Sequence, residues 1–142
     1  MGRIMTRVKI ANSTDVEIVG RGLMTPNEVR RVEIDALVDT GATMLALPED
    51  VVRQLGAPSL GIRKVRDARG IVIEVEWVGN LRIEILGREM TTDALILPAG
   101  ATPLIGQIPL EALDLVVDPK SRELRVNPES PDVPLLDLMH VA

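Results

Sequence analysis

The chain has 142 residues, of which 46% are apolar and only 1% aromatic, and it carries a formal net charge of −5. With one tryptophan, no Phe or Tyr and an excess of acidic side chains, it lacks the aromatic platforms and the cationic surface that bind nucleic acids. It has no cysteine and one histidine, His140, which argues against disulfides, zinc sites, and Ser-His-Asp or Cys-His catalysis. Carboxylate chemistry, binding without chemistry and scaffolding remain.

The expected location follows from the N-terminal residues and the apolar runs. The first ten letters, "MGRIMTRVKI", lack the apolar core of a signal peptide. No apolar stretch reaches the roughly 18–20 residues that span a bilayer. We therefore expect a cytoplasmic protein that binds neither membranes nor nucleic acid.

The N-terminal part of the chain predicts strands. The β-rich runs "RVKI" (7–10) and "VEIVGRG" (16–22) flank "ANSTD" (11–15), whose polar residues suit a turn. Residues 1–31 are therefore expected to form an N-terminal β-hairpin extension. In "RRVEIDALVD" (30–39) polar–apolar alternation gives way to an apolar run, as in a strand that passes from the surface into the core.

The remaining elements are mostly strands with two short helices. "PEDVVRQLG" (48–56) has Pro first, acids in the first turn and Gly after the end, which predicts a helix. The predicted strands that follow are two around a tight turn at 67–70, further β runs at 81–87 and 91–97, and a closing hairpin at 115–126. A second helix could begin at Pro109. We predict one all-β domain over residues 1–126 with one or two short helices, followed by a Pro-rich, acidic tail over 127–142.

One motif, "ALVDTGAT" (36–43), places Asp39 directly after an apolar strand and directly before small residues. Asp-Thr-Gly is an ordinary turn, in which Asp accepts backbone N–H bonds and Gly permits a tight backbone. A surface turn has no need of an apolar lead-in, whereas a site where backbone approaches a ligand does need small residues. The context therefore favours a catalytic Asp39 over a purely turn-forming one.

Three motifs in this order resemble the retropepsin-like aspartic peptidases, in particular their single-domain bacterial members. They are "ALVDTGAT", a flap-like hairpin at "RDARG" (66–70), and "LIG" (104–106) leading into a helix. The resemblance covers the chain from about residue 32 to about residue 126. It implies a retropepsin-like, closed β-barrel-like domain that works as a symmetric homodimer on peptide or protein substrates, with no metal and no cofactor.

The resemblance also implies roles for individual residues. Asp39 would be catalytic and would pair with Asp39 of a second copy, because two adjacent carboxylates that share one proton can both activate water and protonate a carbonyl oxygen. Thr40 and Gly41 would support this dyad, Thr40 by a hydrogen bond across the dimer axis. The implied substrate-binding residues are Gly41, Ala42, Thr43, Ala68, Arg69, Gly70, Leu104 and Ile105, and Gly106 would let the chain pass beneath the catalytic loop.

The sequence departs from the retroviral pattern at one pair of positions. Retroviral members commonly carry an acid where this chain has Thr43 and an arginine where it has Gln107. A Thr43–Gln107 hydrogen bond could replace their ion pair, at about 0.5–1.5 kcal/mol. The flap turn also holds only one glycine, Gly70, and is expected to be stiffer.

Several features allow two interpretations. The basic residues of the flap arm, Arg63, Lys64, Arg66 and Arg69, are either a solvated surface or a means of steering acidic peptides. Trp77 is expected in the core rather than in a substrate platform. The end segment "PLLDLM" (134–139) is either a strand packed on the dimer, which we favour, or a tail that visits the cleft as a self-cleavage site.

The leading hypothesis is an aspartic endopeptidase that hydrolyses peptide bonds flanked by apolar residues, with a water nucleophile and no covalent intermediate. The alternative is a catalytically weak or inactive retropepsin-like dimer that serves as a peptide-binding or assembly module. The intact "DTGAT" favours the first hypothesis. A peptidase that needs trimming of a terminal segment lies between the two.

Overall fold

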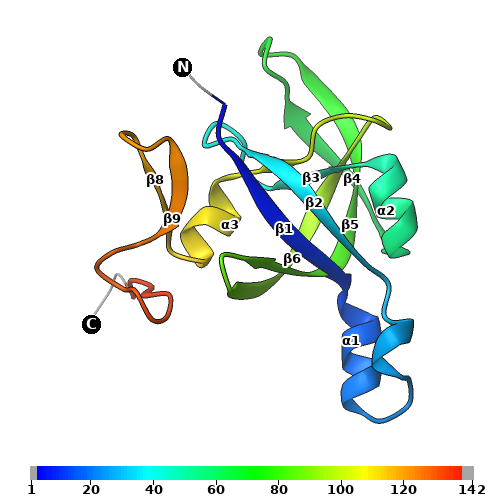
Figure 1. Ribbon diagram of the computed structural model, residues 1–142. Coiled ribbons are helices and arrows are strands. Elements are labelled where there is room, and N and C mark those ends of the chain that lie inside the picture. Colours follow the sequence, from blue (N-terminus) through cyan, green and yellow to red (C-terminus); the bar gives the residue numbers. More distant parts are fainter. Residues whose placement is uncertain (1–2, 139–142) are drawn as a thin grey trace.

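A computed structural model describes residues 3–138 of the chain and shows a barrel-like β domain with short helices at its edges (Figure 1). The strands are β1 (Met5–Asn12), β2 (Arg31–Val38), β3 (Leu45–Pro48), β4 (Ser59–Arg66), β5 (Val72–Ile85), β6 (Arg88–Leu97), β7 (Leu104–Ile105), β8 (Leu115–Asp118) and β9 (Glu123–Val126). The helices are α1 (Ser13–Gly20), the short 3₁₀ helix η1 (Pro26–Glu28), α2 (Glu49–Leu55) and α3 (Gln107–Ala112). The predicted all-β fold is confirmed.

One mixed sheet forms the body of the domain. Its strand order is β1-β2-β7-β3-β6-β5-β4, and β1 also pairs with β5, which closes the sheet on itself. The interior is aliphatic, as expected for a chain almost without aromatic residues, and it includes Ile10, Leu45, Leu81, Ile83 and Ile105, each at most 1% exposed. A separate two-stranded sheet, β8-β9, carries the chain away from the barrel toward the C-terminal segment.

The predicted N-terminal β-hairpin is wrong. Strand β1 pairs with β2, and residues 13–20 form helix α1 instead of a second strand. The polar residues that we interpreted as a turn begin the helix, because the Asn12 side chain accepts the backbone N–H of Asp15 at 3.0 Å and caps the first turn. A capped helix start and a β-rich run are easily confused when the run is as short as "VEIV".

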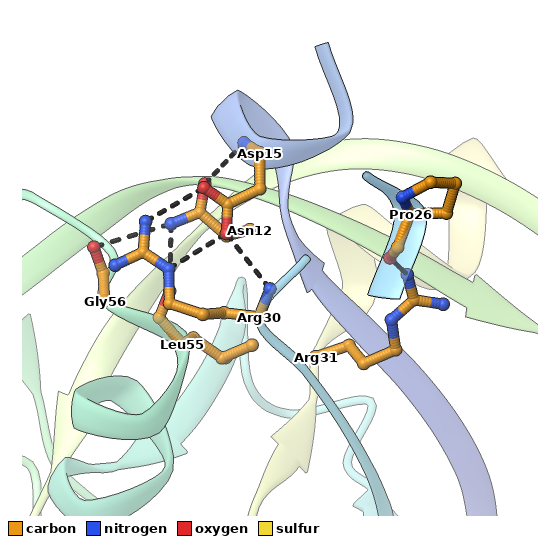
Figure 2. A network of polar contacts seen from close by, with 7 residues as sticks. All are labelled: Asn12, Asp15, Pro26, Arg30, Arg31, Leu55 and Gly56. Atoms are coloured by element: carbon orange, nitrogen blue, oxygen red, sulfur yellow. Dashed lines mark hydrogen bonds and ion pairs between the residues drawn. The ribbon is translucent and has the colours of Figure 1, made fainter. Parts of the chain in front are cut away.

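A buried carboxylate fastens α1 to the barrel (Figure 2). Asp15 is 2% exposed, and its two oxygens accept the Arg30 side chain at 2.9 Å each, while Oδ2 also accepts the Arg30 backbone N–H at 3.0 Å. The guanidinium of Arg30 lowers the pKa of Asp15. Beside them, Asn12 donates to the carbonyl oxygen of Leu55 at 2.9 Å, so the end of α2 joins the same network.

The other predicted elements are confirmed with small shifts in their ends. Helix α2 begins one residue after Pro48, which is its N-cap, and is followed by its C-cap Gly56 in the left-handed conformation (φ 61°). Helix α3 begins at Gln107, two residues earlier than the predicted start at Pro109. The runs at 72–79 and 81–85 form one strand, β5, with a register irregularity between Val78 and Leu81.

Candidate active site

The predicted catalytic carboxylate lies where β2 ends. Asp39 is half-buried, and its backbone N–H donates to the carbonyl oxygen of Ile105 on β7 at 3.0 Å. Its Oδ1 accepts the backbone N–H of Gly41 at 3.0 Å, and its carbonyl oxygen accepts that of Ala42 at 3.1 Å. Within residues 3–138, Oδ2 has no hydrogen-bond partner. Asp39 therefore forms the turn with one oxygen and keeps the other available for chemistry.

The loop after Asp39 rests directly on the chain that leaves β7. A Cβ atom at Gly106 would lie 2.5 Å from the carbonyl oxygen of Met44 and 2.7 Å from that of Ala42, far inside van der Waals contact. The backbone N–H of Gln107 donates to Ala42 at 2.8 Å. The predicted close passage of Gly106 beneath the loop is confirmed, and only glycine fits there.

Strand pairing sorts the residues around the loop onto two faces of the sheet. Residues that are directly opposite on neighbouring strands point to the same face. One set of paired residues crosses the sheet from β2 over β7, β3 and β6 to β5, and we call it the apolar row. Its members, in this order, are Leu37, Leu104, Ala46, Leu95 and Trp77. Alternation along β2 directs Asp39 to the face of Leu37, opposite the core-facing Ala36 and Val38.

The two residues expected to wall the cleft lie on different faces. Leu104 belongs to the apolar row and is partly exposed, on the face of the sheet to which Asp39 is directed. Ile105 is fully buried in the core. Its predicted place in the cleft wall is wrong, because consecutive residues of a strand point to opposite faces and only one of the two can meet a ligand.

The other predicted residues of the loop lie close to the surface. Thr40, Gly41 and Thr43 are exposed and Ala42 is half-buried. The suggested Thr43–Gln107 side-chain bond does not form, because Gln107 donates instead to Glu111 at 2.9 Å, one helical turn further along α3. Backbone atoms instead connect the loop to the start of α3, since the N–H of Ile108 donates to the carbonyl oxygen of Thr43 at 2.9 Å.

The predicted flap is the hairpin of β4 and β5, which extends beyond the barrel (Figure 1). Its tip residues Ala68, Arg69 and Gly70 are exposed. Asp67 organises the tip, because its Oδ1 accepts the backbone N–H of Arg69 at 2.9 Å and that of Ile71 at 3.0 Å. The Arg69 guanidinium, 2.7 Å from Oδ2, and the Ile71 bond lower the pKa of Asp67. We did not single out Asp67 from the sequence, although Asp two residues before Arg and three before Gly is a common turn signal.

Trp77 does not lie in the core, which contradicts its predicted placement. It is partly exposed on the flap side of the apolar row, and the guanidinium carbon of Arg63 lies 3.9 Å from its ring centre. Arg63 stands on β4 opposite Val75, two residue pairs closer to the flap tip than the pair of Gly61 and Trp77. This cation–π pair is a second feature that the sequence analysis missed, because it depends on the register of two strands.

A second carboxylate cluster holds the C-terminal segment. Asp114 accepts hydrogen bonds from the Ser130 hydroxyl, from the Leu135 backbone N–H at 3.0 Å and from Asn127 at 3.1 Å. These bonds, Ser130 first, lower the pKa of Asp114 from 3.8 to about 2, with a further contribution from Arg88. Beyond this clasp, residues 134–138 are in no strand, and Leu135, Leu136 and Leu138 are 63–90% exposed. Met139 and His140 lie outside the described residues.

Two hollows lie away from the loop. One of about 680 Å³ lies between α1, η1 and the outer sheet surface, and one of about 650 Å³ lies along β8-β9; Asp39 lines neither. In residues 3–138 no group of three or more His, Cys, Asp or Glu side chains could hold a metal ion. No helix in that part of the chain is long and apolar enough to cross a membrane.

The closed sheet, the Asp-Thr-Gly loop at the end of β2 and the glycine packed beneath it define a retropepsin-like aspartic peptidase domain. Sequence comparison agrees: residues 26–112, more than half of the chain, match the family described as "gag-polyprotein putative aspartyl protease", and the chain belongs to that family. The match begins after α1 and ends with α3, so it leaves out β1, α1, the β8-β9 hairpin and the C-terminal segment. No curated protein sequence matched the chain.

Proposed function

We propose that the protein is an aspartic endopeptidase whose active site forms when two copies bring their Asp39 side chains together. The observation that carries the proposal is the state of Asp39 in one chain. Its Oδ1 is fixed by Gly41, and its Oδ2 has no partner within residues 3–138. The Asp-Thr-Gly sequence occurs once in the chain, so a dyad needs a second copy.

In this dyad two carboxyl groups share one proton, because two adjacent carboxyl groups cannot both be ionised. The ionised group removes a proton from a bound water, and the protonated group donates to the carbonyl oxygen of the scissile bond. The water oxygen attacks the carbonyl carbon and no covalent enzyme intermediate forms. The protons belong to the pair, so its two apparent pKa values are not assigned to either Asp39.

The remaining residues fit supporting roles. Thr40 is exposed and could bond across the dimer axis, and Gly41, Ala42 and Thr43 lie in the same loop, where an extended peptide would meet its backbone. The flap tip at Ala68, Arg69 and Gly70 would close over the peptide and exclude water. Leu104 and its neighbours in the apolar row favour substrates with apolar side chains near the cut.

The exposed apolar end of the described chain supports a role in the dimer contact. The Asp114 clasp fixes the chain at Leu135, and the leucines that follow have little cover in the single copy. Burial against a second copy would remove this apolar area from water. The hypothesis of self-cleavage near the same segment makes a different prediction, since it would shorten the chain in solution.

The test is cleavage of an unbiased peptide mixture, read by mass spectrometry from about pH 4 to 7, by the unaltered protein and by Asp39→Asn. Products that only the unaltered protein makes would establish the peptidase and reveal its subsite preferences. The oligomeric state is measured by analytical ultracentrifugation on the same samples. A dimer that cleaves nothing, yet binds peptides with the same affinity in both forms, would favour the binding module instead.

A further inference from the structure

The contact between Arg63 and Trp77 is a defined interaction that has no role in the proposed catalytic mechanism. The guanidinium carbon of Arg63 lies 3.9 Å from the ring centre of Trp77, the single tryptophan of the chain. Arg63 forms no ion pair with any carboxylate of residues 3–138, and its cross-strand partner is the apolar Val75. Its charge is therefore balanced only by the ring face and by water, which leaves it able to receive an anion.

The indole offers a second donor beside this cation. Trp77 Nε1–H has no hydrogen-bond partner in the described part of the chain, and the neighbour on that edge is Gly61. A Cβ on Gly61 would lie 3.9 Å from Nε1, in van der Waals contact, so the glycine leaves more room at this edge of the ring than any side chain would. An indole N–H and a guanidinium side by side supply donors to a carboxylate, and a charge-assisted bond is stronger than a neutral one.

The pair lies on the side of the sheet where the proposed chemistry takes place. Trp77 is the last member of the apolar row, which begins at Leu37, two residues before Asp39. Four strand spacings of roughly 4.8 Å each separate Trp77 from Leu37 along the sheet, so the pair lies roughly 15–20 Å from the loop. That span corresponds to about five residues of extended peptide at roughly 3.3 Å per residue.

The charges on the two sides of Trp77 have opposite signs. Asp93 stands on the same face, with its carboxylate over Gly79, where a Cβ would collide with Oδ1. Gly79 lies two residues from Trp77 toward the barrel, whereas Arg63 lies toward the flap tip. An acidic group is therefore repelled on the barrel side of Trp77 and attracted on its flap side.

We propose that Arg63 and Trp77 form a subsite for the carboxylate of a Glu or Asp side chain in the peptide substrate, several residues away from the scissile bond. The proposal rests on the proposed function, since it assigns a substrate class to the same cleft. The substrate would then carry apolar side chains along the apolar row and an acidic side chain at its end, where Arg63 lies over Trp77. In a symmetric dimer each flap would offer one such subsite.

The test measures binding, so that it does not depend on turnover. The probes are an alternating Val-Glu peptide and its Val-Gln counterpart, titrated into full-length Asp39→Asn protein with the fluorescence of Trp77 as the readout. The Val-Glu peptide is expected to bind roughly three- to tenfold more tightly and to change the Trp77 emission. Adding Arg63→Gln should abolish this preference, and Arg63→Lys should restore only part of it, because an ammonium does not stack on the ring as a guanidinium does.

Lys64→Gln is the matched control, since Lys64 is the next residue on β4 and alternation places it on the other face of the hairpin. It removes the same charge and should leave the preference for Val-Glu intact. Equal affinity for the two peptides, or an equal loss in Lys64→Gln and Arg63→Gln, would overturn the subsite and leave only general steering by positive charge. Circular dichroism confirms that each variant is folded.

The outcomes also separate this inference from the proposed function. If the unaltered protein cleaves peptides but Arg63→Gln changes neither binding nor the acidic residues found near the cuts, the subsite is refuted and the peptidase stands. If the Val-Glu preference is present and depends on Arg63, yet nothing is cleaved, the subsite stands and the peptidase is refuted.

Discussion

Two aspartates at the ends of secondary-structure elements, Asp39 and Asp114, differ in how fully their oxygens are used. Asp114 has acceptor bonds to both oxygens, from Ser130, Leu135 and Asn127, which hold its pKa at about 2. Within residues 3–138 the Asp39 side chain accepts one hydrogen bond, from the backbone N–H of Gly41. A carboxylate whose two oxygens both accept hydrogen bonds from the protein has a structural role, whereas one with an unbonded oxygen can bind a water or a substrate.

The backbone around the two carboxylates shows the opposite difference: it is more tightly packed at Asp39 than at Asp114. The Asp39 loop is wedged on Gly106 with no room for a single added carbon. The Asp114 clasp holds a peripheral segment whose leucines are largely exposed. The proposed catalytic carboxylate thus has few hydrogen bonds in a tightly packed frame, and the structural one has several at an exposed edge of the domain. The following predictions test the two halves of this contrast.

The largest effect is expected at Asp39 itself. Asp39→Asn should lower the rate of peptide cleavage by about 10²–10⁴-fold or more, because an amide cannot exchange the proton that the dyad shares. The amide oxygen can still accept the Gly41 N–H, so the melting temperature should change little. Cleavage measured by mass spectrometry and unfolding followed by circular dichroism check both statements, and a variant that cleaves normally would remove Asp39 from the chemistry.

The frame is tested by Gly106→Ala. The new Cβ would meet backbone atoms of Ala42 and Met44, which cannot move independently of the loop, so the free energy of unfolding should fall by about 1–3 kcal/mol or more. Activity should fall even in the molecules that remain folded. Gly20→Ala is the control, because no atom lies within 4 Å of its added Cβ and its stability should be unchanged or slightly higher. Chemical denaturation of both variants gives the comparison.

The clasp is tested by pH. The folded-state pKa of Asp114 is lowered from 3.8 to about 2, so its contribution to stability is fully present above about pH 4 and is lost as the pH falls through about 2. The unaltered protein should melt at a higher temperature than Asp114→Asn at pH 6, and the difference should shrink between pH 4 and pH 2. Asn tolerates the left-handed backbone of this position (φ 54°).

A control for the clasp is Asp132→Asn, which removes one exposed charge from the same segment. It should melt like the unaltered protein at every pH. Limited proteolysis near Leu135 should be faster only in Asp114→Asn. If all three proteins lose stability in parallel below pH 4, the acid dependence comes from other carboxylates and the clasp contributes little.

The smallest effect is expected at the flap tip. Asp67 lies there within the proposed active site, and both of its carboxylate oxygens accept hydrogen bonds. Asp67→Asn should loosen the turn and raise KM by about two- to fivefold with little change in kcat, because one charge-assisted bond at an exposed site is worth little. Since its pKa is lowered, the side chain stays ionised over the assay range and this effect should not vary with pH. Glu74→Gln, an exposed charge on β5, is the control and should leave KM unchanged.

Much of the fold and the centre of the site could be predicted from the sequence, because the signals are local. Helix α2 and the β8-β9 hairpin are marked by Pro, Gly and acidic residues within a few positions of their ends. The close packing of Gly106 against Ala42 and Met44 was implied by the family resemblance, whereas the turn at Asp39 is marked by the small residues directly after it. Such constraints act between residues two to four apart, so the order of letters is enough to show them.

The errors share a different origin. Ile105 and Leu104 are equally apolar, and only the register of β7 between β2 and β3 decides which of them enters the core. Trp77 was expected inside because its neighbours on the same strand face are apolar, but pairing with Leu95 and the Arg63 guanidinium hold it on the outer face. The segment that became α1 was decided by the Asn12 cap and by Arg30, fifteen positions from Asp15.

The sequence by itself therefore determined the class of domain, the carboxylate at its centre and the glycine on which that carboxylate's loop rests. The tertiary structure alone decided which side chains share the face of Asp39 and which are withdrawn from it. The physical reason is that a strand shows alternate residues to opposite faces, so a one-residue change of register between strands distant in sequence exchanges the lining of a cleft with the filling of a core.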